Sequence, residues 1–393
     1  MSKLPVMLTV DTGLSITKNI WRVHPIRSRL LLMSPEVVEV THKSIDFYKT
    51  RKITAPEPEN DVWIGYGRKL YAVGYLAQSY FGARVVLSHL KYEWAIAKVL
   101  GSVGVMAVKE NLPEKFELAL AVLLPYSEWG VKEKFARGVK KALSDFSFCE
   151  RKFSVSVSLF ICVPEGGGHA LARAERIGSA FNNKKIASIM LGYRDVSVVL
   201  FERGVINGQT ERLGMVKMLQ IIQSRTLDQT TREREQRLLE TIHRLGKDIK
   251  PKNFLSLTLS KNTENRLEEA TQIALAVRYA SKEYWKMISS FIRNHLPLDI
   301  EEVILGGGTS DYFRSELTKL ITQNYPDTYV SMSADLEEDV QITYNLQPDN
   351  KALHARLTDA YALSNFLWRQ VCLMPSTEST VRSMEKQNGK EVV

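Results

Sequence analysis

Leu8-Thr-Val-Asp-Thr-Gly-Leu-Ser-Ile-Thr-Lys18 is the stretch of sequence that decides the fold. An apolar strand ends at Asp11, and a tight turn follows at Gly13, a residue type that tolerates conformations other residues avoid. Such a turn offers backbone N–H groups, hydroxyls and an ammonium group to a phosphate chain. The predicted nucleotide contacts are Asp11, Thr12, Gly13, Ser15, Thr17 and Lys18. An aspartate-x-glycine turn is also ordinary hairpin chemistry, so this loop alone leaves both interpretations open.

Metal chemistry in this chain is expected to centre on Asp11. A carboxylate at a strand end can hold Mg²⁺ through water, because this hard cation keeps much of its hydration shell. The three cysteines, Cys149, Cys162 and Cys372, form no Cys-x-x-Cys pair, and the seven histidines are scattered. The sequence therefore predicts neither a zinc site nor a structural disulfide, as is usual in a reducing cytosol.

Length and composition predict a soluble protein with two lobes. A chain of 393 residues is too long for one ordinary domain, and 44% hydrophobic with 25% charged residues is typical of globular proteins. No apolar run approaches the roughly 20 residues that span a bilayer, and the N-terminus lacks the features of a signal peptide. We therefore expect a cytoplasmic protein without membrane contact.

The net charge of +9 is of the kind found in proteins that meet nucleic acids or acidic partners. In one basic stretch, Arg232–Arg244, acids and bases alternate, which is typical of a solvated, salt-bridged helix face. No DNA-binding module is recognisable. We expect no direct sequence-specific contact with DNA.

Hydrophobic periodicity predicts two successive cycles of strands and helices. The predicted strands lie within 6–10, 16–23, 30–40, 61–73, 117–124, 146–163, 186–191, 196–201 and 302–305. The predicted helices cover 86–103, 128–143, 214–227, 229–247, 264–295, 309–324 and 358–368. This is the layout of a duplicated α/β fold with two sheets, each flanked by helices.

A second carboxylate stands at a strand end in Pro164-Glu-Gly-Gly-Gly168. Glu165 in this position could orient and polarise an attacking water molecule. A glutamate after a proline is also common in the first turn of a helix, where it complements the helix dipole. Both interpretations of Glu165 remain open from this segment alone.

Two glycine-containing turns, Leu191–Asp195 and Leu305–Ser310, complete the set. Two hairpins from two domains could clamp a triphosphate from both sides, and a triple glycine lets the backbone approach a base or phosphate at a helix N-terminus. The predicted contacts are Gly192, Tyr193, Arg194, Asp195, Gly306, Gly307, Gly308 and Thr309. Each turn alone could be an ordinary loop, but the order and spacing of all four segments favour a nucleotide site.

Two other nucleotide-binding classes are disfavoured. The chain has no Gly-x-x-x-x-Gly-Lys-Ser/Thr segment, which P-loop enzymes use to cradle phosphates. It also has no Gly-x-Gly-x-x-Gly after a first strand, because Gly65-Tyr-Gly67 lacks the third glycine. A Rossmann-type dinucleotide site is therefore not expected.

Taken in order, these segments resemble those of actin-like ATPases of the actin/Hsp70/sugar-kinase superfamily, most of all the ParM (StbA) bacterial actins that segregate plasmids. The resemblance covers most of residues 4–370. The matching segments are Val6–Lys18 (first phosphate motif), Leu123–Trp129 (a strand end), Val163–Gly166 (the water-activating glutamate, at Glu165), Ile189–Phe201 (second phosphate motif), Arg203–Met215 (the strand and helix start beyond it) and Val303–Thr309 (adenosine motif).

The resemblance implies an actin-like fold of two RNase H-like domains with a nucleotide cleft between them. Domain I is expected at 1–184 plus 352–374, domain II at 185–351, and a polar, disordered tail at 375–393. The family binds ATP or ADP with Mg²⁺ in the cleft, which makes Glu165 and Asp11 the expected catalytic residues. It also forms homopolymeric filaments, which position plasmid DNA through a separate DNA-binding adaptor protein.

One departure from the family pattern bears on catalysis. The second phosphate motif of the family begins with an aspartate, and this chain has Met190 there. A thioether cannot hold hydrated Mg²⁺ or position water. Arg194 could supply charge to the phosphates, and Asp195 matches a later aspartate of the motif. The expectation is that hydrolysis is slow, relies on Asp11 and Glu165 alone, or is lost.

Two alternative functions stay open within the same superfamily. A small-molecule kinase needs a carboxylate base against a substrate hydroxyl, and none stands out within 186–215. A non-filamentous, nucleotide-dependent regulator or chaperone is compatible with Met190, because a switch needs binding more than turnover.

A filament also needs apolar contact surfaces. The candidates are Trp63, Tyr66, Tyr80, Phe81, Trp285 and Trp368, although a place in the core is the favoured interpretation for each.

Overall fold

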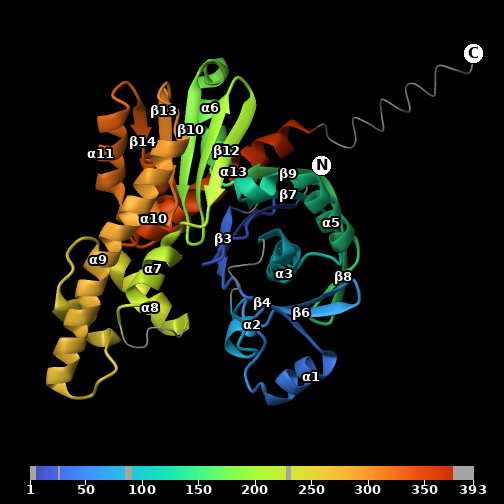
Figure 1. Ribbon diagram of the computed structural model, residues 1–393. Helices are drawn as coiled ribbons and strands as arrows, with labels where there is room; N and C mark the ends of the chain where they lie inside the picture. The colour runs from blue at the N-terminus through green and yellow to red at the C-terminus, as the bar shows by residue number, and fades with distance from the viewer. Residues whose placement is uncertain (1–5, 25–26, 85–90, 227–231, 375–393) are drawn as a thin grey trace, which may run out of the picture.

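Two lobes stand side by side in the computed structural model of the chain, which describes residues 6–24, 27–84, 91–226 and 232–374 (Figure 1). Each lobe is built on one β-sheet, the first with nine strands and the second with five strands among the described residues. The first sheet comes from the N-terminal part of the chain, and the second from the part after residue 184. The predicted α/β class with two sheets is confirmed.

The nine-stranded sheet has the order β3-β2-β1-β7-β9-β8-β5-β6-β4. Its strands are β1 (Val6–Asp11), β2 (Thr17–Arg22), β3 (Arg29–Met33), β4 (Val37–Val40), β5 (Trp63–Tyr66), β6 (Lys69–Val73), β7 (Lys115–Leu124), β8 (Phe146–Phe148) and β9 (Arg151–Pro164). Strand β7 is parallel to both β1 and β9, with Asp11 beside Leu123 and Leu124 beside Pro164. The carboxyl ends of these strands therefore bring Asp11 and Glu165 to the same edge.

The five-stranded sheet has the order β12-β11-β10-β13-β14. Its strands are β10 (Lys185–Leu191), β11 (Val196–Glu202), β12 (Val205–Glu211), β13 (Glu302–Gly306) and β14 (Tyr329–Ser331). Strands β10 and β13 are parallel, with Met190 beside Gly306. This register places the β10–β11 hairpin and the glycine turn after β13 at one edge.

The helices cover the faces of both sheets (Figure 1). They are α1 (His42–Arg51), α2 (Tyr75–Ser79), α3 (Lys91–Lys109), α4 (Tyr126–Trp129), α5 (Lys132–Ser144), α6 (Gly167–Ile177), α7 (Met215–Gln223), α8 (Arg232–Leu245), α9 (Thr263–His295), α10 (Gly308–Tyr312), α11 (Arg314–Asn324), α12 (Ala334–Tyr344) and α13 (Lys351–Leu373). Two 3₁₀ segments, η1 (Gly178–Asn183) and η2 (Pro251–Leu257), follow α6 and α8.

The first sheet is buried on both faces. On one face, α3 and α5 pack against the β-strands through side chains such as Leu100 and Val139, which are fully buried. On the other face, Leu357 and Leu363 of α13 pack against Met7 and Ala121. Helix α13 comes from the far end of the sequence, so the C-terminal part of the described chain returns to the first lobe.

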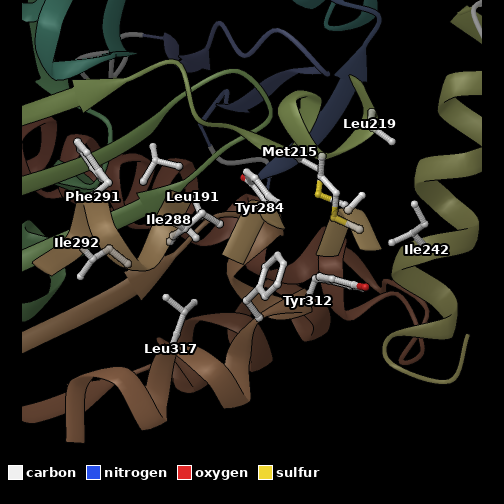
Figure 2. Close-up of a cluster of buried hydrophobic side chains, with 14 of the residues drawn as sticks. Leu191, Met215, Leu219, Ile242, Tyr284, Ile288, Phe291, Ile292, Tyr312 and Leu317 are labelled. Carbon is white, nitrogen blue, oxygen red and sulfur yellow. The ribbon is translucent and has the colours of Figure 1, made fainter. Parts of the chain in front are cut away.

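The second lobe has its own core, which reaches up to the junction between the lobes. Figure 2 shows side chains of α9, including Tyr284 and Ile288, beside Leu191 of β10 and Met215 of α7. Tyr284 is fully buried, and its hydroxyl donates a 2.7 Å hydrogen bond to the carbonyl oxygen of Leu213. The start of α7 is therefore fixed beside the end of β10.

The observed elements differ from the predicted ones in places where periodicity gives no signal. The predicted helix 309–324 is two helices, because the chain turns at Phe313 between α10 and α11. Helices α1 and α12 were not expected, since each buries only one residue, Ile45 or Val340, and shows no apolar stripe. The predicted tail 375–393 and the start of the predicted helix 86–103 lie outside the described residues.

The aromatic residues considered as filament contacts are mostly part of the packing. Tyr80 is 39% exposed, whereas the other five are partly buried. Trp63, for example, packs edge-on against Tyr48, and Trp285 stacks on Phe313. In the described part of the chain, no helix combines the length and the apolar character that crossing a membrane requires.

Candidate functional site

A cavity at the junction of the two lobes brings the predicted motifs together. Its lining comes from both hairpins, the β9–α6 turn and the glycine turn before α10, together with α7, α8 and α13. The lining residues are Asp11, Gly13, Leu14, Ser15, Lys18, Glu165, Met190, Gly192, Tyr193, Arg194, Asp195, Met215, Leu239, His243, Gly307, Gly308, Thr309, Arg356 and Asp359.

Three predicted contacts lie behind the cavity wall rather than in it. Thr12 and Thr17 are almost fully buried, and neither hydroxyl has a hydrogen-bond partner among the described residues. Gly306 is the last residue of β13, where a Cβ would lie 2.3 Å from the His169 ring. Its role is to allow close packing between α6 and the second sheet.

The β1–β2 hairpin presents charges of both signs to the cavity. Asp11 ends β1, and its carboxylate forms an ion pair with the ammonium group of Lys18 on β2. Gly13 is required at the turn, because a Cβ there would lie 2.6 Å from the carbonyl oxygen of Ile16. The buried ammonium group of Lys98, on α3, donates to the carbonyl oxygens of Thr12 and Gly13 at 3.2 and 3.1 Å, and so holds the turn from behind.

The β10–β11 hairpin uses its charges differently. The N–H of Gly192 donates to the carbonyl oxygen of Asp195 at 2.9 Å and closes the turn. The Arg194 guanidinium binds Asp195 of the same turn and Glu128 of α4 in the first lobe, each at 2.8 Å. All three side chains are buried, at 3–4% exposure. This ion pair therefore fastens one lobe to the other.

Burial by itself lowers the pKa of Arg194, and the neighbouring carboxylates more than reverse this effect, so that the pKa is raised. Arg194 is therefore a permanent cation whose charge is already balanced by Glu128 and Asp195. The sequence led us to expect that Arg194 supplies charge to the phosphates. In the structure this charge is paired with Glu128 and Asp195.

The glycine turn after β13 is shaped for close backbone approach. Gly307 has a φ of 90°, and a Cβ there would lie 2.4 Å from the carbonyl oxygen of Leu191. The hydroxyl of Thr309 donates to the carbonyl oxygen of Gly192 at 3.1 Å, which ties this turn to the second hairpin. Glycine at 307 is therefore fixed by both backbone conformation and space.

Arg356 on α13 connects the first hairpin with the glycine turn. Its guanidinium donates a 2.7 Å hydrogen bond to the hydroxyl of Ser15. Its aliphatic part packs against Gly308, where a Cβ would lie 2.6 Å from Cγ of Arg356. Arg356 therefore lies between the hairpin predicted to bind the phosphates and the glycine turn predicted to bind the nucleoside.

One part of the cavity lining is more apolar. Met215 and Leu239 line it together with the imidazole of His243 on α8. Burial, and to a smaller extent the charge of Arg356, lower the pKa of His243 to about 4. The ring is therefore neutral at physiological pH, which suits contact with an uncharged aromatic group.

Glu165 stands at the β9–α6 turn, and another carboxyl group of the cavity, that of Asp359 on α13, lies next to that turn. Burial raises the pKa of Asp359 to about 7, against the lowering effect of hydrogen bonds from the N–H groups of Gly166 and His169. The negative charges of Asp11 and Glu165 raise it further. Asp359 is therefore close enough to Asp11 and Glu165 for their charges to act on it.

Sequence reasoning missed Glu128, Arg356 and Asp359. The last two lie in or beside the predicted helix 358–368, and their signal is the run of buried polar residues on an otherwise apolar helix face, including His354 and Thr358. Glu128 lies in Leu123–Trp129, a segment that carries part of the resemblance, but its pairing with Arg194 gave no signal, because the two residues are 66 apart in the chain.

Comparison with known proteins establishes the fold. No protein-family model matches the sequence, and no curated protein is similar to it in sequence. Solved structures do match. ParM in a 15-stranded filament from Clostridium botulinum has a TM-score of 0.56 at 14% identity, over 94% of this chain and all of that one.

Two further structures have similar scores. ParM of Bacillus thuringiensis, solved with ATP, has a TM-score of 0.55 at 14% identity, over 94% of this chain and 100% of that chain. Ta0583, an archaeal actin homologue, has a TM-score of 0.54 at 13% identity, over 93% and 99%. The protein therefore has the actin-like fold, as its sequence motifs predicted.

Proposed function

We propose that this protein binds ATP with Mg²⁺ between its lobes, hydrolyses the nucleotide and assembles into filaments. The observation that carries the proposal is the single cavity lined by both hairpins, Glu165 and the glycine turn, segments that come from both lobes. Structures of the same fold include a ParM filament and a ParM complex with ATP.

The phosphates are proposed to lie between the two hairpins. The first hairpin contributes the ammonium group of Lys18 and the hydroxyl of Ser15, and its turn contributes backbone N–H groups. The second hairpin, Gly192–Asp195, contributes its backbone, because the Arg194 side chain is paired with carboxylates. Arg356, which already binds Ser15, adds positive charge to the same region.

The nucleoside is proposed to lie toward the glycine turn. Gly307 and Gly308, which line the cavity, let the backbone approach the α-phosphate or ribose, with Thr309 beside them. The base then reaches Met215, Leu239 and neutral His243. These side chains suit a flat, uncharged ring system, and the proposal is adenine rather than guanine by the resemblance to ATP-binding actins.

Mg²⁺ fits the donor set of this site. This cation is usually held by one or two carboxylates together with phosphate oxygens and water. Among the described residues no three His, Cys, Asp or Glu side chains converge in a way that could hold a metal alone. Asp11 lines the cavity and is the carboxylate proposed to hold the ion through water. When bound, the ion neutralises charge on the phosphates.

Glu165 is proposed to orient the attacking water. It lines the cavity from the turn after β9, and Met190 lines the same cavity from near the end of β10. Since the thioether of Met190 cannot accept a strong hydrogen bond from water, Glu165 and Asp11 carry the catalysis. The proposed hydrolysis is therefore slow and serves to limit the lifetime of the filament.

The filament is proposed to position plasmid DNA through an adaptor protein that binds the DNA. Sedimentation with and without Mg-ATP tests the assembly, and phosphate release from the same sample tests the turnover. A pellet that depends on nucleotide and disassembles as phosphate is released supports the proposal. A protein that stays monomeric at high concentration with Mg-ATP contradicts it.

A further inference from the structure

We propose that Asp359 of α13 positions Glu165 by capping helix α6 from outside that helix. The inference rests on the proposed role of Glu165 in hydrolysis and assigns a new residue to that step. Asp359 is 2% exposed and lies far from Glu165 in the sequence. Its effect therefore depends entirely on how the two helices meet.

The contacts of Asp359 are those of a helix cap. One carboxylate oxygen accepts a 2.7 Å hydrogen bond from the N–H of Gly166, and the other accepts a 3.2 Å hydrogen bond from the N–H of His169. Gly166 is the N-cap residue of α6 and His169 is its third helical residue. These are the two N–H groups that a capping box satisfies within one helix.

At the start of α6, neither the N-cap residue nor the third helical residue has a side chain that accepts hydrogen bonds from these two N–H groups. Its N-cap is Gly166, which makes no side-chain hydrogen bond. Its third helical position is His169, whose ring is turned to the hydroxyl of Thr358 at 2.8 Å. Neighbouring residues of α13 thus hold the first turn of α6 through both its backbone and its side chain.

The cap fixes the backbone on both sides of Glu165. The N–H of Glu165 donates to the carbonyl oxygen of Leu124 at 2.7 Å, which holds the peptide unit before it. The N–H of Gly166 donates to Asp359, which holds the peptide unit after it. With both flanking peptide units held, the Cα–Cβ bond of Glu165 has a defined direction at the cavity.

Two of the three glycines of Pro164-Glu-Gly-Gly-Gly168, Gly166 and Gly168, lie at the same contact. Gly166 has a φ of 90°, a conformation that favours glycine, and its N–H donates to Asp359. A Cβ at Gly168 would lie 2.1 Å from the carbonyl oxygen and 2.7 Å from the carboxylate of Asp359. The motif therefore lets α13 come close enough to cap α6.

A cap that only stabilised the helix would predict a different result from a cap that positions Glu165. Asn262 provides the matched control, because it caps α9 by accepting from the N–H groups of Glu264 and Asn265. That cap does not line the cavity. Loss of either cap is expected to loosen a helix start, and only loss of the Asp359 cap is expected to slow turnover.

The test compares phosphate release and nucleotide affinity in the wild type, Asp359→Asn, Glu165→Gln, their double variant and Asn262→Ala. Asp359→Asn keeps the size of the side chain but turns an amide toward one of the two N–H groups. A misplaced catalytic group costs about 100-fold in kcat, and this is the loss expected for Asp359→Asn, with the Kd for Mg-ATP changed less than about threefold. Asn262→Ala is expected to turn over at the wild-type rate.

The double variant separates positioning from an independent effect. If Asp359 acts through Glu165, the double variant is no slower than Glu165→Gln alone, since residues that act as a unit are not additive. Hydrogen exchange of the peptide covering 165–172, measured without nucleotide, is expected to be faster in Asp359→Asn and unchanged in Asn262→Ala. Asp359→Ser, which is smaller and keeps one acceptor, serves if the asparagine variant fails to fold.

Failure of the inference and failure of the proposed function give different results. A wild-type protein that binds Mg-ATP and releases no phosphate contradicts the proposed hydrolysis. A slow Glu165→Gln beside a normal Asp359→Asn overturns the role of Asp359 alone. Losses that multiply in the double variant, or a loss of nucleotide binding in Asp359→Asn, also overturn it.

Discussion

The two hairpins that line the cavity are both tight turns between antiparallel strands, but their charged side chains have different partners. The β1–β2 hairpin places the Asp11–Lys18 pair at the cavity wall, within one lobe. The β10–β11 hairpin places Arg194 in a buried ion pair with Glu128 of the opposite lobe. Both turns are closed by strand pairing and both line the cavity.

The difference teaches that turn geometry alone does not assign a role. A tight turn supplies backbone N–H groups in either hairpin, but the side chains decide what else it does. The first hairpin keeps a carboxylate and an ammonium group at the cavity, which is what a magnesium–phosphate site needs. The second hairpin uses its cation to hold the lobes together, and Met190, the next-to-last residue of its first strand, is apolar. We interpret the first hairpin as the one that contacts the ion and the phosphates. We interpret the second as a clamp, by which we mean that its ion pair holds the two lobes together.

Removing the carboxylate of the first hairpin should have the largest effect. Asp11→Ala is expected to abolish phosphate release, by about 1,000-fold or more, because this side chain is the one proposed to organise the ion that neutralises the phosphates. The measurement is steady-state phosphate release at saturating Mg-ATP. Asp335→Ala, which removes a carboxylate that is 72% exposed, is the control. Unchanged turnover in Asp11→Ala would place the site elsewhere.

Breaking the buried ion pair of the second hairpin should act on stability first. Glu128→Gln removes one of the carboxylates that balance the buried Arg194 guanidinium, and loss of one partner of a buried pair typically costs about 3 kcal/mol. The free energy of unfolding, measured by chemical denaturation, is expected to fall by that amount. Glu150→Gln is the control, because its pair with Lys49 is exposed. Equal effects of the two variants would argue against a clamp.

The glycine turn that meets the second hairpin should tolerate no side chain. Gly307→Ala puts a methyl group 2.4 Å from the carbonyl oxygen of Leu191 at a φ of 90°, and strain of this kind costs about 2 kcal/mol. A weaker Kd for Mg-ATP is expected as well, measured by calorimetry. Gly204→Ala is the matched control, since Gly204 has a φ of 77° and open space where its Cβ would lie. If both variants bind nucleotide equally, the turn does not shape the site.

The smallest predicted effect concerns pH. The pKa of Asp359 is about 7 in the folded protein, mainly through burial, and an unfolded chain has the ordinary lower value. The folded state thus retains a proton that the unfolded chain has released, and the free energy of unfolding falls as pH rises from about 4 to about 7 and levels off above that. Between pH 6 and pH 8 the wild type should lose about 1 kcal/mol relative to Asp359→Asn, measured by denaturation at both pH values. A difference that does not vary with pH would contradict the burial of an ionisable group there.

The sequence predicted the parts of the site that follow directly from local pattern. The end of an apolar strand can be recognised from the sequence alone. Such an end is followed by, or occurs at, Asp11, Glu165 and the glycine turn. The approach of Asp359 to Gly166 cannot be recognised from the sequence, because it depends on α13 packing against the first turn of α6. The pairing of Arg194 with Glu128 was missed for the same reason, since it depends on how the lobes meet.

The measurement that tests the central claim most directly is a cryo-electron microscopy map of the purified protein with Mg²⁺ and a non-hydrolysable ATP analogue. The account predicts nucleotide density between the Asp11 hairpin and the Gly306–Gly308 turn, in subunits arranged as a filament. Density at another place on the protein, or filaments whose cavity is empty under saturating nucleotide, would contradict it.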